Sequence, residues 1–289
     1  MSAEPRRQSA VVPTAPVSVV VPCFCCMGTI RRAIASVAAQ TLLPAEVILV
    51  EDCSGDGTLA TLRDTAAGYP AGWITVVAQP ANAGPSSARN RGWDLATQEY
   101  VAFLDADDSW HPRKIELQMD VLRTDPELML LAHPMDVRTP DAPLRELLPP
   151  ICAKIVPRRV LLSSNPFPTS SVVLRRALPL RFDEARWRAE DYLLWAQIVY
   201  SGRRAGILNQ VLASWHKHPY GAGGLTADLD AMNRAGVDAR RALHAQGLIS
   251  LPELCFAHVI GALRHLRRHW LTRARRSADK AIARSPGGR

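Results

Sequence analysis

In the first 110 residues, short runs of apolar residues alternate with segments in which apolar residues recur at helical spacing. The runs contain many β-branched residues and no polar alternation, as is typical of strands buried on both faces. We predict such strands at residues 17–22, 47–50, 73–77 and 100–104. The helical spacing predicts helices at 29–39, 58–67 and 86–96. This alternation indicates an α/β fold with βαβ units and a mainly parallel sheet flanked by helices.

The pattern changes in the rest of the chain. Proline suits the first position of a helix, so a helix is predicted at 112–122. Residues 128–180 are rich in proline and mix short strands with loops, whereas 189–200 and 232–285 have helical patterns. Residues 1–16 are rich in Pro, Ser and Arg, and we expect a flexible leader there. The chain is therefore expected to end in a helical extension.

Polar side chains stand at the ends of three predicted strands. The segments are Pro22-Cys-Phe-Cys25, Glu51-Asp52 and Asp105-Ala-Asp107-Asp108. In open parallel sheets ligands bind beyond the carboxyl ends of the strands, so these segments predict a ligand site. The carboxylates of Asp105, Asp107 and Asp108 repel one another unless a cation neutralises them, and oxygen ligands suit Mg²⁺ or Mn²⁺. The alternative is a solvated acidic turn that precedes the next helix.

The net charge of +8 lies in one part of the chain. Residues 258–289 hold nine Lys or Arg residues against Asp279, whereas residues 1–257 are balanced. In this part of the chain, apolar residues share one helical face, namely Phe256, Val259, Ile260, Leu263, Leu266 and Trp270. The arginines lie off that face, at Arg264, Arg268, Arg275 and Arg276. The face either packs against the protein or lies on an anionic membrane surface, and no nucleic-acid partner is expected.

The composition of the chain indicates the cellular compartment in which the protein is expected. A hydrophobic content of 47% with 21% charged residues argues against wholesale disorder. Six cysteines in 289 residues do not make a disulfide framework, so we expect reduced thiols. The apolar stretch at 10–21 is interrupted by Pro13 and Pro16, unlike a secretory signal. No run approaches the ~18 apolar residues of a transmembrane helix, which predicts a cytoplasmic protein, peripheral at the inner membrane face if the basic segment binds lipid.

Several motifs occur in order along the chain. They are Val17-Ser-Val-Val-Val-Pro22, Val50-Glu-Asp-Cys-Ser-Gly-Asp-Gly-Thr58, Asn82-Ala-Gly-Pro-Ser-Ser-Ala-Arg-Asn-Arg-Gly92, Phe103-Leu-Asp-Ala-Asp-Asp-Ser-Trp110, Pro112-Arg-Lys-Ile-Glu-Leu-Gln118, Ala189-Glu-Asp-Tyr-Leu-Leu-Trp195 and Trp215-His-Lys-His218. Together they resemble family 2 of the glycosyltransferases over residues 17–225. The resemblance implies a Rossmann-like GT-A fold at 17–230, with a nucleotide-binding half at 17–110 and an acceptor half at 111–230. Residues 231–289 are then a basic helical C-terminal segment.

The resemblance also assigns residues to the nucleotide. Pro22 and Asp52 match the nucleotide pocket, in which the acidic residue binds the base, usually uracil. Asp105 matches the first carboxylate of the family's Asp-x-Asp motif, and Arg89 matches an arginine near the nucleotide. Without the resemblance, Asp52 is interpreted as a turn-forming residue, and Arg89 is interpreted as a surface residue of a helix.

The same resemblance implies a metal site. Asp107, with Asp108 and His218, would hold the Mn²⁺ or Mg²⁺ that bridges the donor diphosphate. The division of roles among Asp105, Asp107 and Asp108 stays open. His216 also offers an imidazole, although the spacing of His218 fits the family better; the alternative for both is an ordinary surface position.

Asp191 is predicted to act as the general base. Glu190-Asp191 matches the family's Glu-Asp pair, whose aspartate deprotonates the acceptor hydroxyl in inverting members. The reaction needs a carboxylate near the anomeric carbon, opposite the leaving diphosphate, and the metal stabilises charge on the leaving oxygen. Acidic residues also favour the first turn of a helix, and the two roles are compatible.

Two residues depart from the family pattern. Cys25 stands where the family usually has Asn, and Cys53 stands where it usually has Gly. A thiol is a weak hydrogen-bonding group, so the change at Cys25 is expected to weaken or alter nucleotide binding. A soft-metal site made by Cys23, Cys25, Cys26 and Cys53 is the alternative to simple packing, but the spacing is no standard zinc pattern.

The sequence thus predicts an inverting glycosyltransferase that moves a sugar from a nucleotide-sugar, UDP before GDP or dTDP, to a saccharide or lipid-linked acceptor. Family analogy suggests bacterial surface polysaccharide synthesis, and the lack of transmembrane runs argues against a processive synthase. A nucleotidyltransferase is one alternative, but residues 22–28 are not a glycine-rich phosphate loop with a basic residue. A catalytically inactive nucleotide-binding relative is the other.

Overall fold

The computed structural model describes residues 14–139, 142–217 and 228–284, except for the side chains of residues 269 and 272–284. Its strands are β1 (Thr14–Cys23), β2 (Leu43–Glu51), β3 (Ile74–Ala78), β4 (Tyr100–Phe103), β5 (Ser109–Trp110), β6 (Leu128–Ala132), β7 (Met135–Val137), β8 (Ala153–Ile155), β9 (Val173–Arg175), β10 (Arg204–Leu208) and β11 (Ala213–Trp215). Its helices are α1 (Ile30–Ala38), α2 (Thr58–Ala67), α3 (Gly84–Leu95), α4 (Lys114–Thr124), α5 (Arg159–Ser163), α6 (Glu190–Tyr200), α7 (Leu229–Ala245) and α8 (Leu251–Arg284). A 3₁₀ turn lies at Thr169–Ser171.

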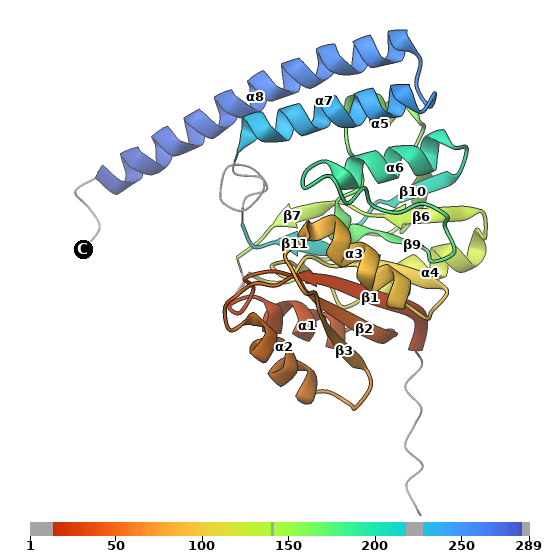
Figure 1. Cartoon of the computed structure of the whole chain (residues 1–289), viewed down its shortest axis with the longest axis vertical. Coiled ribbons are helices and arrows are strands. Elements are labelled where there is room, and N and C mark those ends of the chain that lie inside the picture. The colour runs from red at the N-terminus through yellow and green to blue at the C-terminus, as the bar shows by residue number, and fades with distance from the viewer. Residues whose placement is uncertain (1–13, 140–141, 218–227, 285–289) are drawn as a thin grey trace, which may run out of the picture.

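An eight-stranded sheet in the order β3-β2-β1-β4-β9-β6-β10-β8 forms the centre of the fold (Figure 1). β1 is parallel to β2 on one side and to β4 on the other, and β2 is parallel to β3. The chain therefore leaves β1 in one direction and later returns to its opposite side. Open α/β sheets bind ligands at such a switch in strand order, beyond the carboxyl ends of the strands.

The second half of the sheet is mixed. β9 lies antiparallel between β4 and β6, β10 is parallel to β6, and β8 is antiparallel at the edge. A separate three-stranded sheet has the order β5-β11-β7. The predicted mainly parallel sheet flanked by helices is confirmed, and the antiparallel β9 joins its two halves.

The sheet is covered on both faces, as its continuous apolar strands predict. Val20 of β1 belongs to one hydrophobic core, whereas Val19 and Val21 belong to the other. Successive side chains of a strand point to opposite faces, so one strand supplies both cores. Cys23 and Cys26 are buried in the second core, as expected of packing groups, whereas Cys25 and Cys53 are exposed, so the packing interpretation is wrong for these two.

Helix α3 packs unusually close to β1. A Cβ atom placed on Gly92 would lie 2.3 Å from Cγ1 of Val20. Glycine therefore permits the approach, and the neighbouring Trp93 packs edge-on against Phe103 with ring centroids 5.6 Å apart. The indole N–H of Trp93 also donates to the carbonyl of Arg176 at 2.9 Å. These contacts fix the helix that carries Arg89.

The observed elements follow the predicted ones with a few shifts of boundary. α2 spans the predicted residues, and α3 begins two residues early because Pro85 suits a helix start. β1 begins at Thr14, so the last three residues of the expected leader are strand. The reason is that Thr14 and Ala15 pair with the start of β2, which also begins earlier than predicted, at Leu43.

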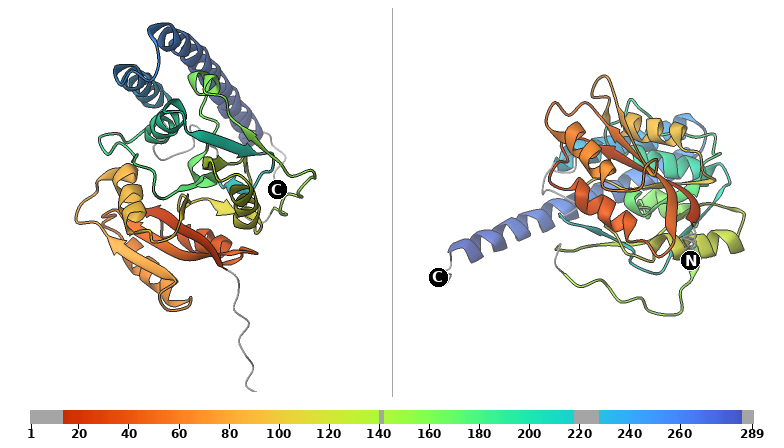
Figure 2. Two further views of the ribbon diagram at one scale, coloured as in Figure 1. Left: turned by 90° about the vertical axis from the view of Figure 1, so that its right-hand side faces the viewer. Right: turned by 90° about the horizontal axis from the view of Figure 1, so that it is seen from below.

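The predicted helical extension consists of α7 and α8, which lie side by side at one edge of the fold (Figures 1 and 2). Asp228 caps α7 by accepting the N–H of Ala231 at 2.8 Å. Leu254 and Ala257 at the start of α8 are buried, whereas its later part projects beyond the body of the protein in Figure 2. Among the described residues, no helix is both long and apolar enough to cross a bilayer.

Candidate functional site

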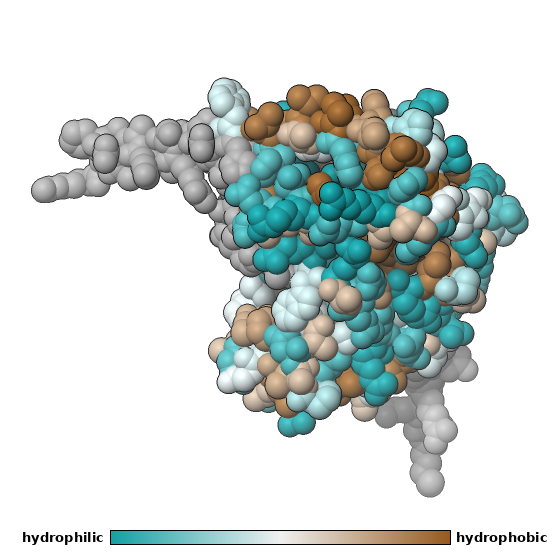
Figure 3. All heavy atoms as spheres, turned by 45° about the horizontal axis from the view of Figure 1, so that its top comes forward, coloured by the Kyte–Doolittle hydropathy of each residue, from teal (hydrophilic) through white to brown (hydrophobic). Residues whose placement is uncertain are grey.

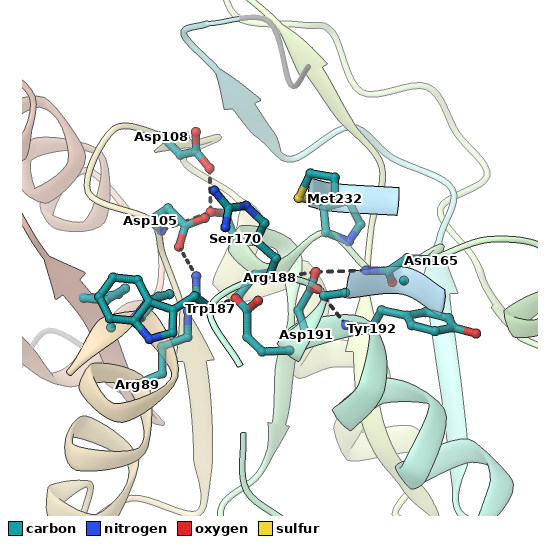
Figure 4. A pocket seen from close by; sticks show the side chains of 18 of the residues that line it. Arg89, Asp105, Asp108, Asn165, Ser170, Trp187, Arg188, Asp191, Tyr192 and Met232 are labelled. Atoms are coloured by element: carbon teal, nitrogen blue, oxygen red, sulfur yellow. Dashed lines mark hydrogen bonds and ion pairs between the residues drawn. The ribbon is translucent and has the colours of Figure 1, made fainter. Parts of the chain in front are cut away.

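A cleft of about 940 Å³ opens at the carboxyl ends of β1, β2 and β4 (Figure 4). One wall carries four residues that the sequence assigns to the nucleotide, Pro22, Asp52, Arg89 and Asp105. The opposite wall is built by the start of α6, by residues 161–170, and by α7 and α8. Asp107, Asp108 and Asp191 also line this cleft, so the fold gathers the described nucleotide, metal and base candidates into one place, with the exception of His216.

The acidic turn after β4 is held from beneath. Arg32 of α1 donates to the backbone carbonyl of Asp107 at 2.8 Å. The hydroxyl of Ser170 accepts the N–H of Asp105 at 3.0 Å and donates to Oδ2 of Asp108 at 2.6 Å. Burial, followed by repulsion from Asp105 and Asp107, raises the pKa of Asp108 well above its ordinary value. Asp108 is only 2% exposed, so the alternative of a solvated acidic turn does not hold for this carboxylate, whereas the side chains of Asp105 and Asp107 are partly exposed.

Arg89 lies between two carboxylates. Its guanidinium pairs with Asp105 at 2.8 Å and with Glu190 at 2.7 Å, and it lies over the ring of Phe182, 5.4 Å from the centroid. Burial alone would lower the pKa of Arg89, but the two carboxylates raise it instead. The side chain is 7% exposed, so the interpretation of Arg89 as a surface residue is wrong.

Asp52 follows β2 and ties that strand to the start of α3. Its Oδ1 accepts the amide of Gln79 at 2.6 Å and the N–H of Ala83 at 2.9 Å, and its Oδ2 accepts the N–H of Gly84 at 2.8 Å. Burial raises the pKa of Asp52, although these hydrogen bonds oppose the shift. The carboxylate is thus fixed in the cleft by two backbone N–H groups and the side-chain amide of Gln79.

Asp191 stands in the first turn of α6, on the other side of the cleft from Asp105 (Figure 4). Its Oδ2 accepts the amide of Asn165 at 2.9 Å, and its Oδ1 accepts the N–H of Tyr192 at 2.6 Å. Burial, followed by the charge of Glu190, raises the pKa of Asp191 to about 7. A carboxylate with this pKa can accept and release a proton at neutral pH.

At the end of β11 and in the two residues after it, alternate side chains reach the cleft. Trp215 and Lys217 line it, whereas Nε2 of His216 lies 2.8 Å from the hydroxyl of Ser109 outside it. Lys217 forms an ion pair with Asp107. Burial alone would lower the pKa of Lys217, but its hydrogen bond to Asp107 and the charge of that residue raise it. His216 is thus placed away from the predicted diphosphate position.

The predicted ligand His218 lies outside the described residues. Among those that are described, no three His, Cys, Asp or Glu side chains form a cluster able to hold a metal ion. Asp105 and Asp107 nevertheless line one side of the cleft, and Mg²⁺ is often bound by one or two carboxylates together with substrate phosphates. The two carboxylates therefore fit a cation that binds together with a diphosphate, better than a cation held by protein ligands alone.

The two cysteines that depart from the family pattern have left-handed backbones, with φ of 47° at Cys25 and 53° at Cys53. Gly and Asn adopt this region more readily than other residues. The N–H of Cys25 donates to the hydroxyl of Ser54 at 3.0 Å, and that of Cys53 donates to the carboxylate of Glu51 at 3.1 Å. Strained backbone is therefore a structural consequence of both departures, and Cys25 also lines the cleft.

The structure adds residues that the sequence did not single out for the site. Lys217 belongs to the motif Trp215-His-Lys-His218, and its positive charge within that motif could have indicated a role in the site. Asn165 and Ser170 fall in the proline-rich stretch without periodicity, and no sequence signal would have found them. Trp187, which is 44% exposed, lines the cleft from the loop before α6.

Comparison with solved structures shows a GT-A-like fold. S. aureus TarS in complex with UDP-GlcNAc aligns with a TM-score of 0.63 at 21% identity, covering 88% of this chain and 72% of that chain. Mannosyltransferase PcManGT from Pyrobaculum calidifontis, in complex with GDP-Man and Mn²⁺, aligns with a TM-score of 0.60 at 19% identity, covering 97% and 85%. At these identities the likeness establishes the fold alone.

The family follows from sequence. The model of glycosyl transferase family 2 matches residues 18–179, more than half of the chain, so the chain belongs to glycosyltransferase family 2. The amylovoran biosynthesis glycosyltransferase AmsB of Erwinia amylovora is 29% identical over 209 residues, which cover 69% of each protein. The succinoglycan biosynthesis protein ExoO of Rhizobium meliloti is 31% identical over 206 residues, which cover 66% of this chain and 58% of ExoO. This membership favours glycosyl transfer over the nucleotidyltransferase alternative.

Replacing Arg89 with Met should lower the free energy of unfolding by about 3 kcal/mol, because the substitution leaves Asp105 and Glu190 without their cation. We take the low end of the usual range because the side chain of Asp105 is 36% exposed. Urea unfolding measures the change. Arg123→Met is the control, since Arg123 pairs with Asp120 at 3.9 Å on the surface, and it should cost less than about 0.5 kcal/mol. Equal losses in both variants would contradict a special role for Arg89.

Replacing Cys53 with Gly should raise the free energy of unfolding by about 0.5 to 1 kcal/mol, because relief of the left-handed backbone outweighs the entropy that glycine loses on folding. The matched control is Cys152→Gly, another exposed cysteine, whose φ is not positive. That change should lower stability by about 0.5 kcal/mol. Thermal and urea unfolding of both variants measure the difference, and a loss of stability in Cys53→Gly would show that residue 53 is unstrained.

Proposed function

We propose that this glycosyltransferase transfers a sugar from a nucleotide-sugar to an acceptor hydroxyl with inversion of configuration. The observation that carries the proposal is the position of Asp191, with a pKa of about 7, across the cleft from Asp105 and Asp107. Inversion needs a base on the acceptor side of the anomeric carbon and charge stabilisation on the leaving-group side. The cleft offers these two functions on opposite walls.

The proposed donor is a UDP-sugar whose base lies against Pro22 and Asp52. The Asp52 carboxylate already accepts three hydrogen bonds within the protein, and an ionised carboxylate has about four lone-pair sites. The remaining site suits the single ring N–H of uracil. The structure of TarS with UDP-GlcNAc is a precedent for a UDP-sugar donor in this fold. Arg89 is committed to two carboxylates, so its proposed role is to position Asp105.

Asp105 and Asp107 are the residues that we propose to hold Mn²⁺ or Mg²⁺ against the donor diphosphate. When bound, the cation would supply Lewis-acid stabilisation of the leaving diphosphate. The Mn²⁺ complex of the relative PcManGT supports a metal in this fold. Asp108 is buried and bound to Ser170, so its proposed part is to support the turn, and a contribution of His218 stays a prediction.

In the proposed reaction, Asp191 takes the proton of the acceptor hydroxyl as the glycosidic bond forms. Asn165 orients the carboxylate through its hydrogen bond to Oδ2. Glu190 stays bound to Arg89, and its remaining charge helps to keep the pKa of Asp191 near 7. The acceptor is proposed to be a saccharide or lipid-linked saccharide in bacterial surface polysaccharide synthesis, since AmsB and ExoO are named for amylovoran and succinoglycan biosynthesis.

A membrane surface is the partner that we propose for α8. Its outer face exposes large apolar side chains, which gather along the described part of the helix (Figure 3), namely Phe256, Val259, Leu263, Leu266 and Trp270, each 52–69% exposed. Ile260, which the sequence placed on this face, is partly buried. The exposed Arg267 borders the apolar stripe, and its charge suits anionic lipid headgroups rather than a second copy of the same basic helix.

Two measurements test the proposed reaction: thermal stabilisation by UDP reports binding, and release of UDP from UDP-sugars reports turnover. We expect thermal stabilisation by UDP that requires Mn²⁺ or Mg²⁺ and disappears in Asp107→Asn. Asp191→Asn should keep this stabilisation but lower kcat by about 100-fold or more, because only the base is lost. Asp94→Asn, an exposed carboxylate of α3 outside the cleft, is the matched control. Nucleotide binding without transfer to any acceptor or to water would establish the inactive relative instead.

The pH profile of the same assay separates a base from a structural carboxylate. Asp191 acts only when ionised, so kcat/KM should rise with pH through a single ionisation near pH 7. Asn165→Ala removes a hydrogen bond that favours the ionised form, so the rise should move to higher pH. A flat profile between pH 6 and 8 would contradict the assignment of Asp191.

Flotation with vesicles tests the membrane surface. The protein should bind vesicles that contain phosphatidylglycerol, and the double variant Leu263→Ser, Leu266→Ser should bind about a hundredfold less tightly or more weakly still, because each buried leucine contributes roughly 1.5–3 kcal/mol. The control is Leu148→Ser, since Leu148 is 68% exposed far from α8 in the sequence. The proposal would be wrong if the wild-type protein does not bind the vesicles and forms a dimer that the double variant does not form. The partner of this surface would then be a second copy of the chain.

A further inference from the structure

Arg240 of α7 is a partly buried cation that the proposed reaction does not use. It lines the wall of the cleft that also carries Asp191. Its Nε atom is buried without a hydrogen-bond partner, and no carboxylate pairs with its guanidinium within the described part of the chain. Burial accordingly lowers the pKa of Arg240. A charge in this position is costly unless something neutralises it.

The fold makes room for this side chain. Arg240 lies against Gly261 of α8, and a Cβ atom at Gly261 would come within 2.7 Å of its Nη2 and 3.1 Å of its Cζ. Glycine inside a helix costs about 1 kcal/mol relative to alanine. α8 thus carries a helix-weakening residue at the point where it meets the guanidinium, and any larger residue would move the guanidinium.

Two more arginines stand on the same wall. Arg264 and Arg268, from successive turns of α8, line the cleft with Arg240, and repulsion from Arg268 adds to the lowering of the pKa of Arg240. Arg240 and Arg264 alone bring two positive charges to this wall, and like charges beside a cavity destabilise one another unless an anion binds between them. Guanidinium groups present paired N–H donors that match phosphate oxygens.

The position of these arginines indicates which substrate would carry the anion. Arg240 is close enough to Tyr192, the residue after Asp191, for their charges to interact. The donor diphosphate is proposed on the opposite wall, beside Asp105 and Asp107. An anion at Arg240 therefore lies on the acceptor side of the base.

We propose that Arg240, with Arg264 and Arg268, binds a phosphate or diphosphate group of the acceptor. The site itself stands on the arginines, whereas its assignment to the acceptor rests on the proposed function. Phosphate of this kind has two sources, a free sugar phosphate or the headgroup of a lipid-linked sugar. The apolar stripe on the outer face of the same helix favours the lipid-linked source.

Binding of inorganic pyrophosphate and of farnesyl diphosphate, each in EDTA, tests the site without a metal at the donor position. Calorimetry should show that Arg240→Gln weakens both by at least tenfold, whereas Arg241→Gln leaves them unchanged. Arg241 is the matched control because it is the next residue of α7, makes the same change of charge and is exposed beside Asp238. Tighter binding of farnesyl diphosphate would identify the lipid-linked source, and equal binding would identify a free phosphate; both outcomes support the site.

Two further variants protect the test against a folding defect. Arg264 is exposed, so Arg264→Gln should fold normally and weaken pyrophosphate by about threefold, and Arg240→Lys should restore part of the loss in Arg240→Gln. Equal affinity of Arg240→Gln and the wild type, or equal losses in Arg240→Gln and Arg241→Gln, would overturn the proposal. UDP binding with Mn²⁺ is measured on the same wild-type sample. If UDP does not bind in the presence of Mn²⁺, the proposed donor site is wrong. The measurements in EDTA still test the role of Arg240 independently.

Discussion

The arrangement of the cleft depends on one buried guanidinium. Arg89 joins Asp105 at the end of β4 to Glu190 at the start of α6. Glu190 lies 101 positions after Arg89 in the sequence. Without this cation, the two carboxylates would repel across the cleft and their burial would be unfavourable. Because Asp191 follows Glu190 directly, the same ion pairs fix the proposed base relative to the acidic turn. The distance between the two chemical functions is thus set by a single side chain.

The same arrangement explains why Asp191 differs from its neighbours. Glu190 is neutralised by Arg89, yet its charge still acts on Asp191 through a partly buried environment and helps to raise that pKa to about 7. Asp105, in contrast, pairs directly with the Arg89 guanidinium, as Glu190 does. The proposal therefore gives two adjacent carboxylates different roles: Glu190, which pairs with Arg89, positions the site, and Asp191 accepts the proton. General base catalysis works best with a pKa near the working pH, which this division provides.

The sequence predicted the elements well where periodicity was strong. The four strands from 17 to 104 and the helices around 58–67 and 189–200 appear close to their expected bounds, since continuous apolar runs and helical spacing leave little freedom. The candidate carboxylates also met in one cleft, as the rule for strand ends requires. What could not be predicted depends on tertiary contacts: Arg89 reads as a surface helix residue until the partner 101 positions away is in place.

Other residues escaped for the same kind of reason. Asn165 and Ser170 reach the cleft from an irregular stretch, so neither period nor motif marks them, and the left-handed backbones of Cys25 and Cys53 are invisible until the turns are built. α8 shows the reverse case. The sequence left packing and lipid contact as alternatives for one face, whereas the helix packs through Ala257 and Gly261 and exposes Leu263 and Leu266.

Helix α8 then links two properties that are usually argued separately. With 3.6 residues per turn and a diameter of about 10 Å including side chains, its cleft-facing arginines and its exposed apolar stripe are held within one helix width of each other. A phosphate bound at the cleft-facing arginines and a membrane beneath the apolar stripe would therefore lie on two sides of the same helix. An acceptor whose phosphate joins a sugar to a lipid would use both sides. A sugar phosphate in free solution would use the arginines but would leave the apolar stripe without a purpose.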